Sequence, residues 1–505
     1  MFVLSRTMQF NAADMAELGR RGHTPASIEA QIKRFTRDIR PVKLEHPCTA
    51  GDGILRLDAA ECHRLLTVFE RESGHYRLAK FVPASGAATR MFEHLFHFSE
   101  DAISQLTEFF ILHFDRFPFV TQLDAMLTSA GISLTALKEQ NRWREIFGYI
   151  LGPEGLNYAD TPKGLVAFHR YRNHVRTAFE EHIPEALAYA RSGAGSCAIH
   201  FTLAPAHMGR VTSFLQDCIR RAYPDDQITI SHSVQALHSE TIALDRQNQP
   251  ARDGSGQLIF RPSGHGALIQ NLPLCEADIL FIKNIDNVTT DSQREPMIFY
   301  KKVLGGMLIE LKTQAGQLLR RLSHREPGTE TEAIEFVHHW FQPGISLPAD
   351  TDAQRDELYR RLDRPMRVCG MVRNEGEPGG GPFWVRMADG QLSKQIVEKS
   401  QVDTADVHQA RILAEATHFN PVDIVCSLTN ESGKTYTLDQ YVDYSTGFVS
   451  EKFHHGKVIR ALELPGLWNG GMAHWNTVFV EVPVSTFHPV KTVNDLLRSG
   501  HMEEV

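Results

Sequence analysis

Apolar and polar residues change their spacing several times along the chain. Residues 1–75 have the mixed spacing of amphipathic helices, and Thr24-Pro25 is typical of a helix start, with threonine as cap and proline in the first turn. The first continuous apolar run, residues 78–83, predicts a buried strand. Residues 92–152 return to helical spacing, so the pattern predicts an N-terminal helical region over 1–75 and a helical insertion over 92–152.

From there on, short apolar runs alternate with longer amphipathic stretches. Strands are expected at 198–203, 228–234, 277–285, 367–372, 383–387, 422–428 and 478–482, and helices at 207–222, 295–322 and within 325–360. Strands that alternate with helices indicate βαβ units. The prediction for residues 76–505 is therefore an α/β domain with a mixed, mainly parallel sheet flanked by helices.

Composition narrows the class of protein. The formal net charge of -8 argues against a protein that coats nucleic acid, because broad phosphate binding needs a basic excess. The seven cysteines are dispersed and include no C-x-x-C pair, as expected for reduced thiols in a cytoplasm. No apolar run approaches 18 residues and the N-terminus lacks a signal-peptide layout, so we expect a cytoplasmic chain without membrane contacts.

A turn of small residues follows the strand predicted at 78–83. It contains Ser85, Gly86, Ala87, Ala88 and Thr89, and ends at Arg90. Backbone N–H groups in such a turn can cradle a phosphate, and the guanidinium adds a bidentate donor. A packing turn without a ligand is the commoner meaning of this pattern.

Two further residues suit phosphate chemistry by position. Asp286 follows the apolar strand predicted at 277–285, and ligands of open α/β sheets lie beyond such strand ends. Its carboxylate could bind Mg²⁺, although an aspartate there is also an ordinary turn residue. Lys163 follows Pro162 at a predicted helix start, where it could attract an anion or simply face solvent.

The segment 487–497, FHPVKTVNDLL, places Lys491 in a turn between an extended apolar run and a helix start. It resembles the F-x-P-V-K-T-x-x-D-L-L segment of UDP-sugar pyrophosphorylases, which join UTP to a sugar 1-phosphate. The turn around Arg90, the Pro-Lys pair at 162–163 and the strand end at Asp286 are similar to segments of the same family, in the same order. Residue Ala88 replaces a loop glycine of that family.

Three more segments extend the resemblance. Gly264, His265 and Gly266 lie in a cluster similar to the family's P-G-G-(H/N)-G motif, which holds uracil. Glu398 lies in a segment that resembles V-V-E-Y-S-(E/Q), near the sugar. The stretch from Trp468 to Val480 is rich in Trp, Asn and Gly, and the residues Asn469 and Asn476 within it are weaker sugar-site candidates.

The resemblance implies a nucleotidyltransferase-like fold of the GT-A or Rossmann-like type. The whole chain is most similar to an uncharacterised bacterial domain-of-unknown-function family that distantly resembles these pyrophosphorylases. The implied substrates are a nucleoside triphosphate and a sugar 1-phosphate, with Mg²⁺ as cofactor. The implied catalytic residues are Arg90, Lys163 and Lys491; the loop 85–89 and the turn 264–266 would hold the nucleotide, and Asp286 the metal.

Two alternatives stay open. A nucleotide-sugar-binding protein without turnover would keep the pocket but not the chemistry, and the residue Ala88 favours this reading. A glycosyltransferase on the same fold would need a D-x-D metal motif at a strand end, and no predicted strand end carries one. The sugar, the base and the oligomeric state do not follow from the sequence.

Overall fold

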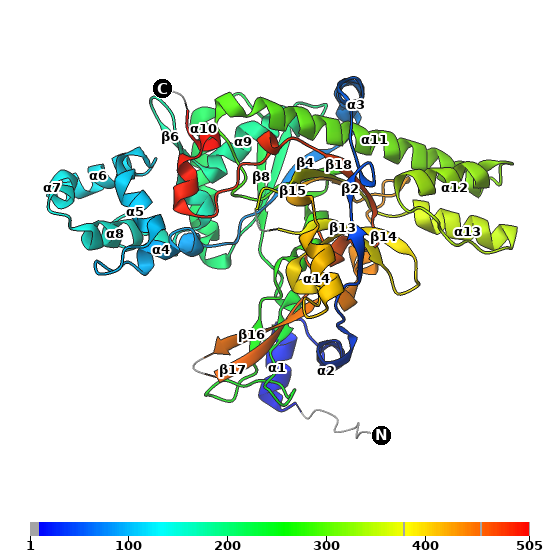
Figure 1. Ribbon diagram of the computed structural model, residues 1–505, viewed down its shortest axis with the longest axis horizontal. Helices are drawn as coiled ribbons and strands as arrows, with labels where there is room; N and C mark the ends of the chain where they lie inside the picture. The colour runs from blue at the N-terminus through cyan, green and yellow to red at the C-terminus, as the bar shows by residue number, and fades with distance from the viewer. Residues whose placement is uncertain (1–9, 377–378, 455–456, 504–505) are drawn as a thin grey trace.

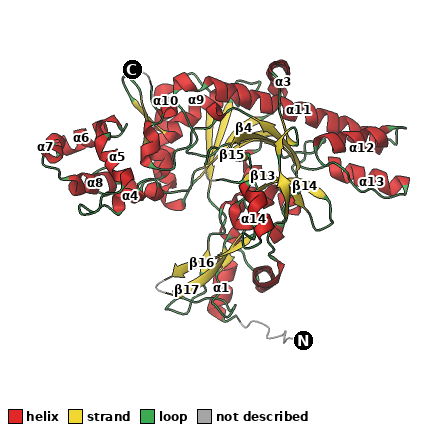
Figure 2. Ribbon diagram, viewed as in Figure 1, coloured by secondary structure: helices red, strands yellow, loops and turns green. Residues whose placement is uncertain are grey.

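A nine-stranded sheet forms the centre of the molecule in the computed structural model (Figures 1 and 2). The structure describes residues 10–376, 379–454 and 457–503, so the ends of both expected regions (1–9 and 504–505) and part of the loop expected at 375–382 lie outside it. In sheet order the strands are β2 (Thr49–Ala50), β3 (Gly53–Leu55), β18 (Asn476–Glu481), β12 (Met366–Arg373), β15 (His418–Ser427), β11 (Ile279–Ile282), β4 (Leu78–Pro83), β7 (Cys197–Thr202) and β8 (Ile228–Ser233). Only β15 runs antiparallel to its neighbours among these strands, so the expected mainly parallel α/β sheet is confirmed.

Both faces of the sheet are buried, which explains why its central strands are apolar without alternation. On β4, Leu78 and Val82 face a core shared with α3 (Ala59–Glu72), α9 (Ala178–Tyr189), α10 (Met208–Ala222) and α11 (Glu295–Ser323). Ala79 and Phe81 face a second core, which is covered by the 3₁₀ helix His265–Cys275. Figure 1 shows α11 running along the top of the sheet.

Smaller groups of elements surround the sheet (Figure 1). The helices expected within 92–152 are α4 (Glu93–Phe96), α5 (Gln105–Leu112), α6 (Val120–Ser129), α7 (Leu134–Glu139) and α8 (Trp143–Leu151), which lie together on one side. On the other side lie α12 (Thr329–Trp340) and α13 (Thr351–Leu362). Below the sheet lie α1 (Ala12–Arg20), α2 (Pro25–Lys33), α14 (Val407–Ala414) and the hairpin β16–β17 (Phe448–His454 and Lys457–Glu463).

Two local expectations are wrong. The region 1–75 is helical at α1, α2 and α3, but residues 44–55 form β1 (Leu44–Pro47), β2 and β3, and β3 pairs with β18 in the central sheet. β1 joins a separate three-stranded sheet with β13 (Gly381–Arg386) and β14 (Leu392–Val397). Lys163 does not precede a helix: it begins a single 3₁₀ turn, after which Ala167–Arg170 (β5) pairs with Val175–Thr177 (β6). β9 (Thr241–Ile242) and β10 (Phe260–Arg261) form a further short pair.

No helix within the described ranges is long and apolar enough to cross a membrane.

Candidate functional site

Two lysines far apart in the sequence meet at one carboxylate. The Asp286 Oδ2 atom lies 2.6 Å from the Lys163 Nζ atom and 3.4 Å from the Lys491 Nζ atom. Lys163 also donates to the backbone carbonyl of Val490. These three side chains, which we call the lysine–aspartate cluster, lie beyond the carboxyl end of β11, where ligands of open α/β sheets bind.

Backbone contacts fix the strand end against the C-terminal segment. The Val490 N–H donates to the Asp286 carbonyl at 3.1 Å, and the His488 N–H donates to the Asn287 side chain at 2.9 Å. The Asp495 carboxylate accepts from the Lys491 N–H at 2.8 Å, which holds the turn that presents this lysine. Asn287 and Asp495 were not among the expected site residues, although both lie inside the motifs that were.

Electrostatics favour an ionised Asp286. Burial raises the pKa of this carboxyl, but the ammonium groups of Lys163 and Lys491 outweigh burial and lower the pKa overall. Within the three side chains of the cluster, one carboxylate faces two ammonium groups, and the Asp495 carboxylate lies in the adjoining turn, where it accepts from the Lys491 N–H. The cluster is therefore suited to attract an anion such as a phosphate.

The small-residue loop lies against the same segment. The Lys163 N–H donates to the Gly86 carbonyl at 3.1 Å, and the Ala88 N–H donates to the Thr161 carbonyl at 3.0 Å. The Ala88 N–H is therefore occupied. The N–H groups of Ser85, Gly86 and Ala87 make no hydrogen bond within the described residues, and all three residues are exposed.

The loop does not depend on glycine. Within 85–90 no residue has a positive φ, so Ala88 causes no strain at the position where the family pattern has glycine. Gly86 itself would meet nothing within 4 Å if it carried a Cβ. Three backbone donors thus remain available to a ligand in a conformation that alanine tolerates.

Arg90 follows this loop on the exposed surface. Its side chain lines a cavity of about 320 Å³ together with His94, His97 and Thr492, and the last of these is next to Lys491. The Val493 N–H donates to the Met91 carbonyl at 2.9 Å, which joins the two segments. The structure therefore brings Arg90, Lys163, Asp286 and Lys491 into one neighbourhood.

A second cluster contains the expected base and sugar residues. The His265 ring stacks on Trp468, with ring centroids 4.2 Å apart, and its Nε2 atom lies 3.4 Å from the Glu398 Oε1 atom. The hydrogen bond from His265 is the main reason that the pKa of Glu398 lies below its usual value. Within the described residues, no hydrogen bond or ion pair joins this cluster to the lysine–aspartate cluster.

Glycines in this cluster serve backbone packing. A Cβ on Gly266 would lie 2.0 Å from the Pro465 carbonyl oxygen, and Gly264 has a φ of +77°. Asn469 is buried beside the same turn, and its side chain accepts from the Gly470 N–H at 2.7 Å. The turn 264–266 is thus held against 463–470.

Asn476 lies elsewhere. It is the first residue of β18 and lies at the amino end of this strand, whereas Asp286 lies beyond the carboxyl end of β11. Its amide donates to the carbonyls of Arg361 and Leu362 at 3.0 and 3.2 Å. Since the side chain is buried and both amide hydrogens are engaged, Asn476 supports the packing of α13. The structure does not bring it to the other candidate residues.

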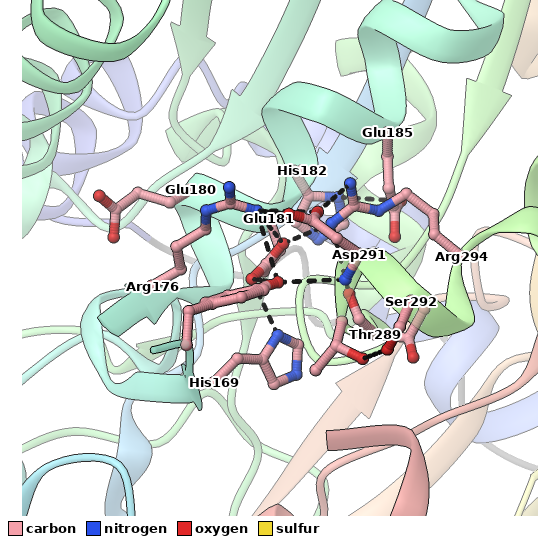
Figure 3. Close-up of polar contacts among 12 residues, drawn as sticks. His169, Arg176, Glu180, Glu181, His182, Glu185, Thr289, Asp291, Ser292 and Arg294 are labelled. Carbon is pink, nitrogen blue, oxygen red and sulfur yellow. Dashed lines mark hydrogen bonds and ion pairs between the residues drawn. The ribbon is translucent and has the colours of Figure 1, made fainter. Parts of the chain in front are cut away.

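A buried network behind the cluster has no counterpart among the expected residues. Glu181, fully buried on α9, accepts from His169, Tyr171 and Arg294 at 2.9, 2.8 and 2.6 Å (Figure 3). In the same view Arg176 lies against Glu181 and Asp291. In the sequence, only the polar run Glu180-Glu181-His182, which lies between apolar residues, could have indicated this network.

The network anchors the turn that carries Asp286. His182 contacts the Ile285 carbonyl at 3.2 Å, and the next turn of α9 brings Glu185 between Lys80 and Lys283 at 2.7 and 2.9 Å. All three charged side chains are buried. Paired buried charges of this kind need well-defined geometry, so α9, the middle of β4 and the end of β11 are fixed relative to each other.

The lysine–aspartate cluster offers one carboxylate, that of Asp286, to a metal ion. Among the described residues there is no group of three His, Cys, Asp or Glu side chains that could hold one. Asp286 uses its Oδ2 atom for both lysines, while its Oδ1 atom accepts no hydrogen bond within the same ranges. A single free carboxylate oxygen suits Mg²⁺ only in the manner of sites completed by substrate phosphates and water.

Comparisons with known proteins agree with this architecture. A solved UDP-N-acetylglucosamine pyrophosphorylase from Trypanosoma brucei, in complex with an inhibitor, matches with a TM-score of 0.51 at 12% identity. The match covers 97% of this chain and 79% of that one. A mutant UDP-glucose pyrophosphorylase from Leishmania major, in complex with UDP-glucose, matches with a TM-score of 0.44 at 12% identity, over 97% and 79% of the two chains.

The fold is therefore that of the UDP-sugar pyrophosphorylases, and it is nucleotidyltransferase-like, as the sequence predicted. No curated protein matches the chain. A family model described as "Domain of unknown function (DUF4301)" matches residues 11–502, which is nearly the whole chain. The chain belongs to this DUF4301 family.

Proposed function

We propose that this chain is a nucleotidyltransferase that forms a UDP-sugar and pyrophosphate from UTP and a sugar 1-phosphate. The observation that carries the proposal is the meeting of Lys163 and Lys491 at Asp286, beyond the carboxyl end of a parallel strand. The pyrophosphorylase fold supports it. UTP and the sugar 1-phosphate both bring negative charge, which two lysines and Arg90 would neutralise.

The chemistry needs no covalent intermediate. An oxygen of the sugar phosphate attacks the α-phosphorus of UTP, a new P–O bond forms, and the bond to the bridging oxygen of the β-phosphate breaks as pyrophosphate leaves. Lys163 and Lys491 stabilise the charge on the α-phosphate and the sugar phosphate, and the free N–H groups of 85–87 with Arg90 hold the β- and γ-phosphates.

The remaining candidates take supporting roles. Asp286 would bind Mg²⁺ through its Oδ1 atom, and the ion would neutralise phosphate charge when bound. The turn Gly264-His265-Gly266 would contact the base. Glu398 and Asn469 would lie near the sugar, whereas Asn476 is now a packing residue.

Release of pyrophosphate tests the proposal. Purified protein with Mg²⁺ and UTP is expected to release pyrophosphate when one of a panel of sugar 1-phosphates is added. Lys491→Ala should lower kcat by about 10²-fold or more, because a charged group that contacts the transferred phosphate is removed. Lys138→Ala is the matched control, because this lysine also pairs with an aspartate, Asp115, but lies on the insertion.

The control should retain wild-type turnover. Pyrophosphate release that persists unchanged in Lys491→Ala would show that the site assignment is wrong. A second function is favoured by one contact: the Ala88 N–H is occupied by the Thr161 carbonyl. A nucleotide-sugar-binding protein would bind UTP or UDP-sugars in calorimetry, without turnover of any pair in the panel.

A further inference from the structure

A second cavity lies at the end of the sheet strands that is opposite to the lysine–aspartate cluster. It has a volume of about 750 Å³ and is lined by the first residues of β18, the end of α13 and the turn between β13 and β14. Segments 40–43 and 443–446 complete the wall. Since β11, β12 and β18 run in the same direction, this cavity lies at their amino ends, and Asp286 lies beyond a carboxyl end.

The lining of this cavity is basic. Six side chains with a positive charge line it: Arg40, Lys43, Arg361, Arg364, Arg386 and Lys394. Only two carboxylates, Asp389 and Asp443, are present in the lining. Burial lowers the pKa of His474, which also lines the cavity, so this ring adds no positive charge at neutral pH.

Two of the six cations already have carboxylate partners. Arg361 lies 2.7 Å from Glu357 and Arg386 lies 2.7 Å from Glu45. The other four (Arg40, Lys43, Arg364 and Lys394) form no ion pair with any side chain that the structure describes, and the side chains of residues 37 and 38 are not among these. Asp443 accepts from Ser445 and Asp389 from Gln391, and neither forms an ion pair with a described side chain, so the two carboxylates offset only part of this positive charge.

Lys394 is the least usual of these cations. It is only 8% exposed, and within the described residues its ammonium donates to a single uncharged acceptor, the Trp340 carbonyl, at 2.8 Å. Arg364 likewise donates only to a carbonyl, that of Arg360, at 3.1 Å. Burial is the main cause that lowers the pKa of Lys394 to about 8. Buried charges are normally paired, and no described carboxylate lies within ion-pair distance of Lys394.

The nature of the ligand follows from size and donors. A volume of about 750 Å³ lies in the range of small-molecule sites and exceeds what one inorganic anion needs. Guanidinium and ammonium groups are the donors that proteins use for phosphate. The hydroxyl groups of Ser445 and Thr446 add uncharged polar groups to the wall.

We infer that this cavity is a second binding site, separate from the lysine–aspartate cluster, for a small phosphate-bearing metabolite of the size of a sugar phosphate. Arg364, Lys394 and Lys43 bind the phosphate group, and the polar wall contacts the rest of the molecule. The site does not rest on the proposed reaction, because it shares no residue with the candidate catalytic site.

Calorimetry with glucose 6-phosphate tests this inference, because a 6-phosphate is not the substrate of the proposed reaction. Inorganic phosphate is the second probe, and sodium chloride at equal ionic strength is the non-specific control. Arg364→Gln and Lys43→Gln are each expected to weaken glucose 6-phosphate binding roughly 10-fold or more. Lys394→Met should abolish glucose 6-phosphate binding. If this buried variant does not fold, Arg364→Gln and Lys43→Gln, which change less buried side chains, still decide the test.

Two control variants separate the sites. Arg411→Gln removes an exposed arginine of α14 that pairs with Glu415, and should bind like wild type. Lys491→Ala should also bind glucose 6-phosphate like wild type, whatever its effect on pyrophosphate release. No binding of either probe up to about 10 mM, a Kd of millimolar order or weaker, would overturn the inference. The inference would also be overturned if glucose 6-phosphate binding were lost in Lys491→Ala but kept in Arg364→Gln. The same holds if sodium chloride at equal ionic strength abolished the binding.

Discussion

Glu481, the last residue of β18, contacts residues from the ends of three neighbouring strands. Its carboxylate lies 2.7 Å from Arg56, which follows β3, and 3.3 Å from both Arg373 of β12 and His418 of β15. The hydrogen bond from Arg56 is the largest cause that lowers the pKa of Glu481 to about 2, with burial opposing it and His418 adding to it. One side chain thus links four strands of the sheet.

This contact predicts a pH-dependent stability. Because the folded-state pKa of Glu481 lies below the unfolded value of 4.5, its contribution is fully present above pH 4.5 and is lost as the pH falls towards 2. Glu481→Gln should lower Tm by about 1–3 °C at pH 7, since most of these partners are exposed. Calorimetric scans from pH 7 to 3 should show this difference shrinking below pH 4.5.

Glu415→Gln provides the comparison, because among the described side chains Glu415 pairs only with Arg411, at 3.6 Å, at the exposed end of α14. It should follow the wild-type Tm at every pH. A Glu481→Gln difference that stays constant down to pH 3 would contradict the assignment of the stabilising contact to the ionised carboxylate.

At the scale of elements, α11 packs directly on α3. A Cβ on Gly306 would lie 2.0 Å from the Leu65 carbonyl oxygen, and one on Gly305 would lie 2.7 Å from the Phe69 ring. These two glycines let the helix backbones approach closely. They allow a 29-residue helix to cover the sheet together with α3.

Gly306→Ala is therefore expected to destabilise the fold, by about 2 kcal/mol or more, because a backbone carbonyl cannot move aside as a side-chain tip can. Gly316→Ala in the same helix is the matched control, since its Cβ would find nothing closer than the Glu431 side chain at 3.8 Å. That change should be neutral or stabilising, by up to about 1 kcal/mol. Urea unfolding of both variants checks the contrast, and equal losses would contradict it.

The elements that the sequence predicted correctly share one property. Short apolar runs such as β11 indicate a strand by their length, and long amphipathic stretches such as α11 indicate a helix by their periodicity. β2 and β3 are two and three residues long and include Gly53, so they carry no periodic signal. Their position is set by pairing with β18, which no local pattern can report.

The candidate site divides in the same way. Lys163, Asp286 and Lys491 stand at a strand end or in short motifs, so their types and neighbours indicated phosphate chemistry. The sequence did not predict the basic cavity, because its cations come from separate segments, near residues 40, 364 and 394, without any common spacing. Asn476 was predicted as a sugar-site residue and is not near the other candidates. A dense Trp-Asn-Gly stretch does not reveal whether each of its residues lies at the amino or the carboxyl end of a strand.

At the scale of the whole molecule, the chain end holds the turn that follows Asp286. The Gly500 carbonyl accepts from the Thr289 hydroxyl at 2.6 Å and from the Thr290 N–H at 3.3 Å. His501 lies 2.8 Å from His169, within the network around Glu181. Residues 500 and 501 are thus tied to the middle of the sequence.

Removing residues 499–505 should loosen that turn without unfolding the sheet. We expect amide hydrogen exchange at residues 287–292 to become faster by about 10-fold or more. The truncation removes the partners of three hydrogen bonds from this turn, donated by Thr289, Thr290 and Ser292, which costs about 1.5–4.5 kcal/mol. Exchange mass spectrometry measures this directly, and β8 at the far edge of the sheet serves as the internal control. Unchanged exchange at 287–292 would show that the chain end does not support the turn.

The position of β18 has a consequence for synthesis in the cell. This strand, residues 476–481, lies between β3 and β12, so the sheet closes only after these residues have left the ribosome. Until then β3 and β12 each present an open strand edge, and unpaired edges recruit other chains. The nascent protein should therefore depend on chaperones that shield the edges of β3 and β12 until residues 476–481 have emerged.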